Sequence, residues 1–537
     1  MTRIAVHNLG DKEQNVTKED AQPSRAFNRI HEVVRPWVKA QPDAPALQDS
    51  KLKLTYTELS QAIDSVAERL QDLGVRPGDR VLLVAENCVS LATLVLACSA
   101  CDAWAVVVNP RLSAREIDNF LEHSDARRAI YVANVSRDAL DHGNRARANL
   151  EAFPYLGDVL VGPLNAAAAP EPVSRDPAQQ VAAMIYTSGT SGSPKGVMLT
   201  HANFLYMASL AATLRRLGPQ DIVYGILPMA HVVGLSSQLL GAVSCGCTLL
   251  LEERFSPEVL HTAICAKGVT VFLGVPAMFA RLLEWCAKTR ASVAGHRLRI
   301  IGASGSPLMP ELKHAVESAF GMPLQNGYGL TELSPTVAQT SLDAPRTDCA
   351  AGMPIPGLEV RIVDNLGNDV ERCSTGELWV RGPNLMKGYY KAPEQTRIAV
   401  NAEGWFNTGD LARQDADGAL FIVGRTKELI IRSGFNVYPV EVEQVLNSHP
   451  GIVQSAVVGR QVEGNEEVVA FIELASDAPV TRDALLNFLR ERLSPYKLPA
   501  EVRVMHPLPA APTGKLLKGE IKKLAAVAAD ARQVILS

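Results

Sequence analysis

The sequence predicts an α/β protein with a large N-terminal domain of mostly parallel α/β layers, a β-rich subdomain and a small α+β C-terminal domain. Three observations predict it. The 537 residues are 47% hydrophobic and 20% charged, a globular composition that suits about three or four compact units. Strand-length apolar segments alternate with helical segments over the first 350 residues. Short strands broken by Gly, Pro, Asn and Asp follow from about Gly352, and a compact α+β pattern begins after Arg425.

The first predicted helix spans about residues 59–73, because its apolar residues recur at helical spacing. Thr55 and Glu58 supply a capping box before it, and Gly74 follows as a stop. Residues 81–84 then form a short buried strand. This helix is therefore expected to lead into a sheet.

Later in this region, strands continue to alternate with helices whose first residue is a proline. We expect helices at 257–267, from Pro276 onward and at 310–320, with strands at 269–273 and 298–301 between them. Alternation of this kind indicates a mostly parallel sheet covered by helices on both faces.

The stretch 165–180 is rich in alanine and proline and predicts a surface linker. In the C-terminal part we expect a helix at 440–447, strands near Val453 and Val468, and a helix at 482–493.

Charge and apolar patterning exclude several classes of protein. A net charge of −4 gives no basic footprint for nucleic acid. Residues 1–25 form a polar N-terminal segment without the apolar core of a signal sequence. The longest apolar run, 89–101, is shorter than the roughly 18 residues of a membrane span. We therefore expect a cytoplasmic protein with no integral membrane association.

Two cysteine pairs, Cys98 with Cys101 and Cys245 with Cys247, have no histidine or cysteine cluster nearby that would complete a zinc site. Both lie in apolar runs, and we interpret them as small buried hydrophobic residues.

The most informative segment is 186–196, Tyr-Thr-Ser-Gly-Thr-Ser-Gly-Ser-Pro-Lys-Gly. Its glycines, hydroxyl groups and Lys195 can surround a polyphosphate, because oriented backbone amides favour anions. It is not a Walker A loop, since Pro194 stands five residues after Gly189. The alternative is a flexible Ser/Gly linker, but Pro-Lys-Gly directly before an apolar stretch is unusual for one.

This loop resembles the phosphate loop of the adenylate-forming superfamily, which includes acyl-CoA synthetases, coumarate-type ligases, peptide-synthetase adenylation domains and beetle luciferases. The resemblance spans nearly the whole chain from about residue 30, because further family motifs occur in the family's order: Leu227–His231, Gly302–Pro307, Gly327–Glu332, Gly404–Asp410, Gly424–Lys427 and Pro512–Lys515. Ser306 departs from the alanine that is more common in the family.

The resemblance implies a two-step reaction. A carboxylic acid and ATP give an acyl-adenylate and pyrophosphate, and a coenzyme A thiol then displaces AMP. Thr331 would offer a hydroxyl to a phosphate and Glu332 an oxygen ligand to Mg²⁺, Tyr328 would pack along the adenine, and Asp410 would accept from the ribose hydroxyls. Taken alone, Asp410 also suits a simple turn after Gly409.

Two lysines have different implied roles. Lys195 would hold the departing pyrophosphate, and Lys515 would align the carboxylate with the α-phosphate, as a point charge on a flexible stem can. Without the resemblance, Lys515 would be interpreted as a surface lysine.

The small C-terminal domain is implied to be mobile. It would rotate about a hinge at 425–430 that contains Lys427, and Gly434 would then let the pantetheine pass. The implied domains are 26–424 for the large AMP-binding part and 431–537 for the C-terminal part.

The site residues that the resemblance implies fall into three groups. The catalytic residues are Lys515, Thr331, Glu332 and His231, with Glu332 as the metal ligand. The nucleotide and coenzyme A groups are Thr187, Ser188, Gly189, Thr190, Ser191, Gly192, Lys195, Ser304, Gly305, Ser306, Pro307, Asn326, Gly327, Tyr328, Gly329, Asp410, Arg425 and Gly434. The acyl pocket is His231, Val233, Gly234, Gly302 and Gly329.

For the acid itself we favour an apolar medium- or long-chain fatty acid. The run Val232–Leu235 is small and apolar, it holds no Arg or Lys that could pair a second carboxylate, and Gly234 leaves space for an open tunnel. The alternative is an aryl acid of the benzoate or cinnamate type. An enzyme that loads a carrier protein, luciferase-type oxidation and a non-catalytic nucleotide-binding homologue are further alternatives. The expected partners are the acid, ATP with Mg²⁺ and coenzyme A, and a homodimer is left open.

Overall fold

Two large sheets carry the N-terminal part of the chain. The computed structural model describes residues 27–187, 195–433, 435–462, 465–475, 480–510, 516–527 and 534–536. One sheet has nine strands in the order β16 (Met353–Pro354), β15 (Thr336–Gln339), β14 (Leu324–Gly329), β13 (Ile300–Ser304), β12 (Val271–Gly274), β10 (Ile222–Gly225), β11 (Thr248–Leu251), β1 (Pro45–Gln48) and β2 (Lys53–Thr55).

The second sheet has eight strands, in the order β19 (Gly388–Tyr389), β9 (Lys195–Thr200), β8 (Val181–Thr187), β4 (Trp104–Val108), β3 (Arg80–Val84), β5 (Arg128–Tyr131), β7 (Gly157–Val161) and β6 (Asn149–Phe153). In both sheets the central strands are parallel and strands at both edges are antiparallel. The predicted fold class is confirmed, and the antiparallel strands are added at the edges of the parallel centres. Short connections such as that between β1 and β2 allow only antiparallel pairing, whereas parallel neighbours need a long crossover.

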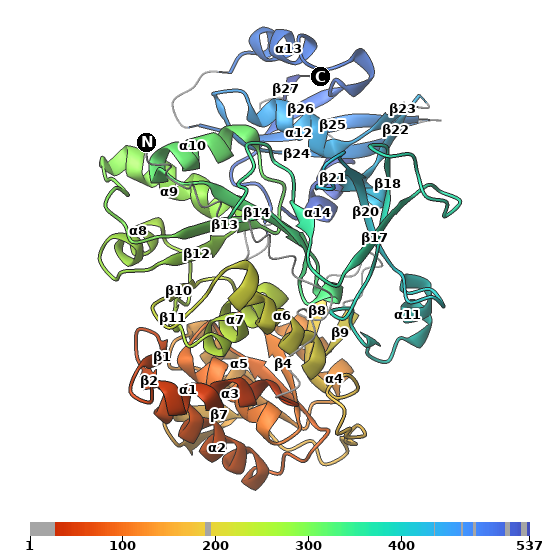
Figure 1. The fold of residues 1–537 in the computed structure, drawn as a ribbon. Coiled ribbons are helices and arrows are strands. Elements are labelled where there is room, and N and C mark those ends of the chain that lie inside the picture. The colour runs from red at the N-terminus through yellow and green to blue at the C-terminus, as the bar shows by residue number, and fades with distance from the viewer. Residues whose placement is uncertain are drawn as a thin grey trace, which may run out of the picture.

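Helices lie around these sheets, and the N-terminal region also contains the 3₁₀ turn η1 (Ile30–Val34) and the π-helical turn η2 (Val233–Leu240). The α-helices are α1 (Arg35–Ala40), α2 (Tyr56–Asp72), α3 (Val89–Ala100), α4 (Ala114–Ser124), α5 (Arg137–Arg145), α6 (His201–Leu214), α7 (Gly241–Ser244), α8 (Pro257–Cys265), α9 (Pro276–Thr289), α10 (Pro310–Phe320) and α11 (Pro393–Ala399). Figure 1 shows this arrangement, with colours that run from red at η1 to teal at α11.

Local sequence signals account for several of these bounds. The Thr55 hydroxyl accepts from the Glu58 amide and the Glu58 carboxylate accepts from the Thr55 amide, so the predicted capping box of α2 is formed. Helix α10 begins at Pro310 and ends before Gly321, whose φ of 65° suits a glycine after a helix.

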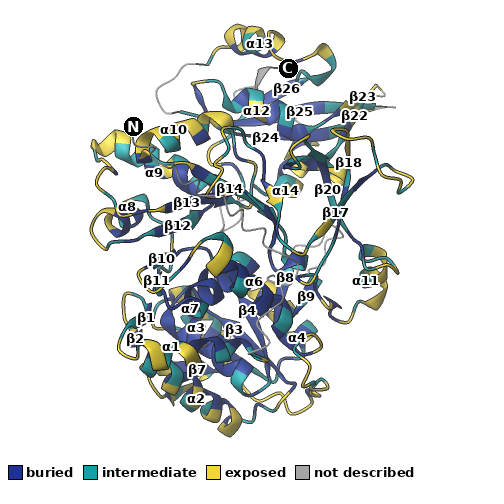
Figure 2. Cartoon of the chain, in the orientation of Figure 1, coloured by how far each residue is buried: buried dark blue, intermediate teal, exposed yellow. Residues whose placement is uncertain are grey.

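The apolar run at 89–101 forms α3, a helix buried on every side (Figure 2). Within the described residues, no helix is long and apolar enough to cross a membrane. Cys98 and Cys101 are buried in and beside this helix, and Cys245 and Cys247 are also buried, as predicted.

The β-rich part is a four-stranded antiparallel sheet of β17 (Glu359–Val363), β18 (Thr375–Arg381), β20 (Phe406–Gln414) and β21 (Leu420–Arg425). The C-terminal part contains the hairpin of β22 (Ile430–Arg432) and β23 (Phe435–Val437). It also contains a four-stranded sheet of β24 (Ile452–Val462), β25 (Asn465–Leu474), β26 (Glu501–Val504) and β27 (Val534–Leu536), with α12 (Pro439–Asn447), α13 (Arg482–Arg490) and α14 (Lys518–Ala525). Two hydrophobic clusters between Ile430 and Ala525 belong to this part alone, and α12 contacts β21.

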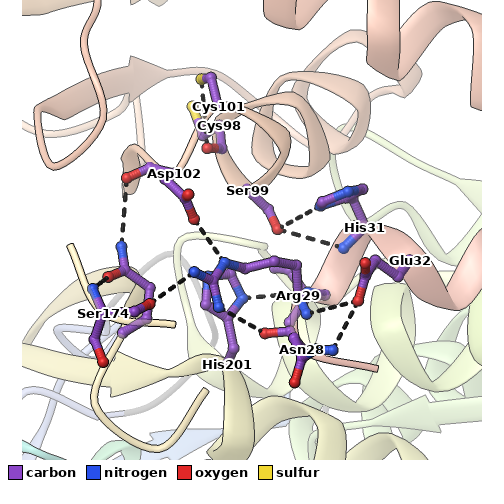
Figure 3. Close-up of polar contacts among 12 residues, drawn as sticks. Asn28, Arg29, His31, Glu32, Cys98, Ser99, Cys101, Asp102, Ser174 and His201 are labelled. Atoms are coloured by element: carbon purple, nitrogen blue, oxygen red, sulfur yellow. Dashed lines mark hydrogen bonds and ion pairs between the residues drawn. The ribbon is translucent and has the colours of Figure 1, made fainter. Parts of the chain in front are cut away.

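The beginning of the described chain is tied to the start of α6 (Figure 3). Arg29 donates from Nε to Asp102 at 2.6 Å and from Nη2 to the Ser174 carbonyl oxygen at 2.7 Å, and the Ile30 amide donates to Nδ1 of His201 at 3.2 Å. The predicted linker at 165–180 has no helix or strand, yet its Ser174 carbonyl oxygen accepts from Arg29 and its Ala169 carbonyl oxygen accepts from Arg80 of β3.

Candidate active site

A large cavity of about 1340 Å³ lies between the two main parts of the molecule. Its walls come from α9, the loop after β13, the end of β14, strands β20 and β21, and helix α12 of the C-terminal part. In Figure 1 the blue C-terminal elements lie directly above β14 and α10. Among the predicted site residues, its lining includes Gly305, Ser306, Pro307, Asn326, Gly327, Tyr328, Gly329, Asp410 and Arg425.

The carboxylate of Asp410 is at the centre of one group of polar contacts in this cavity. Its Oδ2 accepts from the Tyr328 hydroxyl at 2.5 Å, and its Oδ1 pairs with Nε of Arg425 at 2.9 Å. The Asp410 side chain is only 4% exposed, although the guanidinium side chain of Arg425 is 46% exposed. Antiparallel pairing of β20 with β21 puts Asp410 directly opposite Arg425. Three motifs that lie far apart in the sequence therefore meet at one carboxylate.

The charges of this group shift the pKa values of its members. Burial and the adjacent Asp410 carboxylate raise the pKa of Tyr328 well above its usual value, so the hydroxyl remains a donor. Burial on its own would lower the pKa of Arg425, but Asp410 and Glu428 outweigh it and raise that pKa. The Tyr328 hydroxyl and the Arg425 guanidinium therefore both keep their protons and remain donors to Asp410.

A second group joins the phosphate-loop strands to Glu332. Glu332 lies in the 3₁₀ turn η3 (Thr331–Leu333), directly after β14, and its Oε1 accepts from the Tyr389 hydroxyl at 2.9 Å. Nζ of Lys195 lies 4.6 Å from the centre of the Tyr389 ring. Burial and the Glu332 carboxylate raise the pKa of Tyr389. Tyr389 thus contacts both residues, Lys195 through its ring and Glu332 through its hydroxyl.

The oxygens of Glu332 fit a magnesium ion, because Mg²⁺ prefers oxygen ligands and one Glu332 oxygen has no protein donor among the described residues. Thr331 lies in the same turn, partly buried. No group of three or more histidine, cysteine, aspartate or glutamate residues that could hold a metal occurs in the described chain. A metal here would therefore complete its ligands with phosphate and water.

The tip of the phosphate loop lies outside the described residues. It contains the predicted site residues Ser188, Gly189, Thr190, Ser191 and Gly192. The strands on either side are paired, with Thr187 opposite Lys195. Gly434 and Lys515 also lie outside the described residues. Their neighbours are described: the Ser433 amide donates to Asn465, and Leu516 lines the large cavity.

A small cavity of about 100 Å³ adjoins the large one and shares Gly305 and Asn326–Gly329 with it. Asn326 is fixed because its side-chain amide donates to the carbonyl oxygens of Cys349 and Ala350. The small cavity is lined by Leu214, Arg215, Val233, Ser237, Leu273, Ile300, Gly302–Gly305, Gln325–Gly329, Pro335, Thr336, Gln339, Thr340 and Leu342.

This lining corrects three expectations about the acyl pocket. The space is small and not an open tunnel. Gly234 does not line it and gives no room there, because a Cβ at that position would lie 2.3 Å from the carbonyl oxygens of Leu227 and Pro228. A cation is present after all: Arg215 comes from the end of α6, outside the run Val232–Leu235 on which that expectation rested.

The other predicted residues are distributed around these cavities. Val233 and Gly302 line the small cavity, as does Ser304, whereas His231 is exposed and lines neither cavity. Lys427 is exposed in the 3₁₀ turn η4 (Thr426–Glu428), directly after β21.

Sequence reasoning missed three polar residues at the site. Tyr389 and Arg215 are single residues without a motif of their own. Lys518, at the start of α14, lines the large cavity and pairs with Glu428 at 3.0 Å and Glu443 at 2.9 Å. The last contact links the C-terminal helix α14 to α12, three residues after the predicted Lys515. The segment Gly388–Lys391, Gly-Tyr-Tyr-Lys, was the one available signal for Tyr389.

Comparison with known proteins gives a consistent result over most of the chain. The family model described as AMP-binding enzyme matches residues 34–390, and the one described as AMP-binding enzyme C-terminal domain matches residues 441–515. A 2-succinylbenzoate–CoA ligase of Bacillus cereus is 34% identical over 487 residues, which are 90% of this chain and 96% of that protein. A feruloyl-CoA synthase of an Amycolatopsis species is 33% identical over 488 residues, with the same coverage.

Among solved structures, the o-succinylbenzoate coenzyme A synthetase of Bacillus subtilis in complex with ATP and magnesium is 29% identical. It has a TM-score of 0.77 and covers 91% of this chain and 99% of its own. The same enzyme in complex with its acyl-adenylate intermediate has a TM-score of 0.78 and covers 94% of this chain and 98% of its own.

Proposed function

The chain belongs to the AMP-binding enzyme family, and we propose that it joins an aromatic carboxylic acid to coenzyme A. It is an AMP-forming acid–thiol ligase, because its relatives of matching length are CoA ligases and synthetases. ATP, Mg²⁺ and coenzyme A are its cofactor and co-substrates, since a structural neighbour binds ATP with magnesium and the relatives act with CoA.

In the first step, a carboxylate oxygen of the acid attacks the α-phosphorus of ATP, and the bond to the β-phosphate oxygen breaks, so pyrophosphate leaves. Both reactants are anions, so the site must supply positive charge and alignment. We assign the phosphates to the loop at 187–192, Lys195 and Thr331. Mg²⁺, held by Glu332, would neutralise phosphate charge.

The nucleoside end is assigned to the Asp410 group. A buried carboxylate that already has two donors still has lone pairs for ribose hydroxyls, and Asp410 lines the large cavity. Tyr328 would pack along the adenine, with Ser304–Pro307 and Asn326–Gly329 forming the nearby walls. Arg425 would hold the Asp410 carboxylate in its orientation.

In the second step, the coenzyme A sulfur attacks the carbonyl carbon of the acyl-adenylate, the carbon–oxygen bond to AMP breaks, and the thiol proton goes to solvent. We propose a large domain at 26–424, a hinge at 425–430 and a C-terminal domain at 431–537 that turns between the steps. The position of Leu516 and Lys518 on the large cavity supports a role for Lys515 in the first step. Gly434, between β22 and β23, would serve the second step.

Half-reactions test this division of labour. Lys515→Ala should slow adenylation about 10²–10³-fold while thioester formation from supplied acyl-adenylate continues. Gly434→Leu should do the reverse, because a side chain would block the thiol but not ATP. Pyrophosphate exchange and CoA thioester yield separate the two steps. If each variant loses both half-reactions equally, the two-conformation proposal fails.

The small cavity is the single observation that most favours an aromatic acid over the fatty acid expected from the sequence. Its volume of about 100 Å³ is comparable to that of the apolar cavity of about 150 Å³ that holds one benzene. A medium or long alkyl chain would need a longer space. The substrates named for the two relatives above, 2-succinylbenzoate and ferulate, are aromatic acids. Val233 and Gly302 would form part of its walls.

The test is a CoA-dependent AMP-release screen over benzoate, cinnamate and succinylbenzoate analogues beside fatty acids of four to sixteen carbons. We expect at least one aromatic acid to exceed every fatty acid in kcat/KM. A fatty acid of medium or long chain with the highest kcat/KM would overturn the aromatic proposal and leave the ligase activity standing.

A further inference from the structure

We propose that Arg215 binds a second acidic group on the substrate, so that the preferred acid of this enzyme is an aromatic acid with a further carboxylate. This inference deepens the proposed function and depends on it. It begins from a cation without an anion: Arg215 lines the small cavity, and its guanidinium has no hydrogen bond or ion pair with any residue of the described ranges.

The neighbouring arginines show that this is a property of Arg215 and not of the region. Arg216 pairs with Asp343, and Arg299 pairs with the fully buried Asp221. Arg299 also donates to the carbonyl oxygen of Arg215 at 3.2 Å. The backbone of Arg215 is thus held by a paired arginine, while its own guanidinium has no such partner.

Desolvation of this guanidinium is substantial. Burial lowers the pKa of Arg215 to about 10, and the Cys245 thiol offsets that effect only in part. The side chain therefore stays protonated at neutral pH. A desolvated charge without a partner is unfavourable unless an anion compensates it, and Arg215, which is partly buried, lines the small cavity, where an anion can reach it.

Chemistry around Arg215 suits a carboxylate. Ser237, Gln339 and Thr340 line the same cavity and carry hydrogen-bonding groups beside the apolar Val233 and Leu273. A planar guanidinium binds a carboxylate through two parallel hydrogen bonds. In so small a cavity, one ring would occupy the apolar part and its acidic substituent the end near Arg215.

A competing role for Arg215 is structural. It is the last residue of the turn that ends α6, where the helix dipole favours a cation. That role would stabilise the protein equally with every substrate. The two roles can therefore be separated by whether the effect of a substitution depends on the acid.

The experiment compares kcat/KM for matched acids that differ in one carboxylate: 2-succinylbenzoate with 4-oxo-4-phenylbutanoate, and hexanedioate with hexanoate. The proteins are wild type, Arg215→Gln, Arg215→Lys and, as the matched control, the exposed neighbour Arg216→Gln. The wild type should prefer the aromatic diacid. Arg215→Gln should lower kcat/KM for that diacid about 10- to 150-fold, nearly spare the monoacid, and be partly rescued in Arg215→Lys.

Thermal unfolding of each variant shows whether it is folded. Equal losses with diacid and monoacid, or the same pattern in Arg216→Gln, would overturn the role of Arg215. If the wild type activates no aromatic acid, the aromatic proposal fails. In that case, selective loss of hexanedioate in Arg215→Gln would still support the assignment of Arg215, and unchanged hexanedioate activity would overturn it.

Discussion

Replacement of Asp410 by asparagine tests the centre of the nucleotide site. Asparagine keeps the shape of the side chain but removes its charge. In the structure, Asp410 accepts from the Tyr328 hydroxyl at 2.5 Å and from Arg425 at 2.9 Å. An amide can accept at its oxygen, but its NH₂ group would face one of these two donors.

The magnitude follows from these contacts. A hydrogen bond to a charged group contributes about 1.5–3 kcal/mol. The Tyr328 contact is part-buried, on the buried Asp410, and should count for more than the ion pair with Arg425, whose side chain is 46% exposed and whose charge is screened by solvent. We therefore expect the free energy of unfolding to fall by about 1.5–3 kcal/mol. Loss of a charged acceptor for the ribose should raise the KM for ATP about 10- to 150-fold.

The assay is steady-state AMP release with varied ATP at saturating acid and CoA, together with urea unfolding. The matched control is Asp417→Asn. Asp417 lies in the turn between β20 and β21 and also pairs with an arginine, Arg346, but its side chain is far more exposed than that of Asp410. The control should leave the KM for ATP unchanged. An unchanged KM in Asp410→Asn, with the expected loss of stability, would refute ribose binding and leave Asp410 a purely structural residue.

Four other substitutions have distinct expected results. Tyr389→Phe removes the hydroxyl that holds Glu332 and should raise the Mg²⁺ concentration for half-maximal activity about 10-fold; equal Mg²⁺ dependence would contradict it. Gly329→Ala puts a Cβ 1.9 Å from a backbone oxygen and should unfold or inactivate the protein, whereas Gly302→Ala meets only a leucine methyl at 2.9 Å and should fold normally but favour smaller acids. Burial lowers the pKa of His201 well below 6.5, so below pH 6.5 the unfolded state binds a proton that the folded state does not. The free energy of unfolding should therefore decrease by up to about 1.4 kcal/mol per pH unit below 6.5. Denaturant unfolding of His201→Gln at several pH values should show a free energy of unfolding that depends less on pH.

Much of the fold could be predicted because it is encoded locally. Helix α10 begins at a proline and ends at a glycine, and α2 has a capping box, so both were correctly placed by short patterns. The antiparallel edges of the two sheets could not be predicted, because they depend on which distant strands are neighbours. The length of the run at 89–101 excludes a membrane span, but its composition does not predict that the helix α3 is surrounded by protein on every side.

The candidate site divides in the same way. Tyr328, Asp410 and Arg425 lie in motifs, and the structure brings them together. Arg215 has no local sequence signal, and the only one for Tyr389 is the short segment Gly388–Lys391. Their positions become meaningful only when strands and helices remote in sequence enclose Glu332 and the small cavity.

The pairing of β1 has a consequence for folding during synthesis on the ribosome. Leu47 of β1 lies beside Leu249 of β11 in the nine-stranded sheet, about 200 positions later in the chain. At about 5–20 residues per second, β11 is synthesised about 10–40 s after β1. During that interval β1 can pair only with β2, and the edge of β1 that later pairs with β11 is exposed to other chains. Nascent chains should therefore depend on chaperones until residue 251 has emerged, and a polypeptide that stops at residue 187 should aggregate.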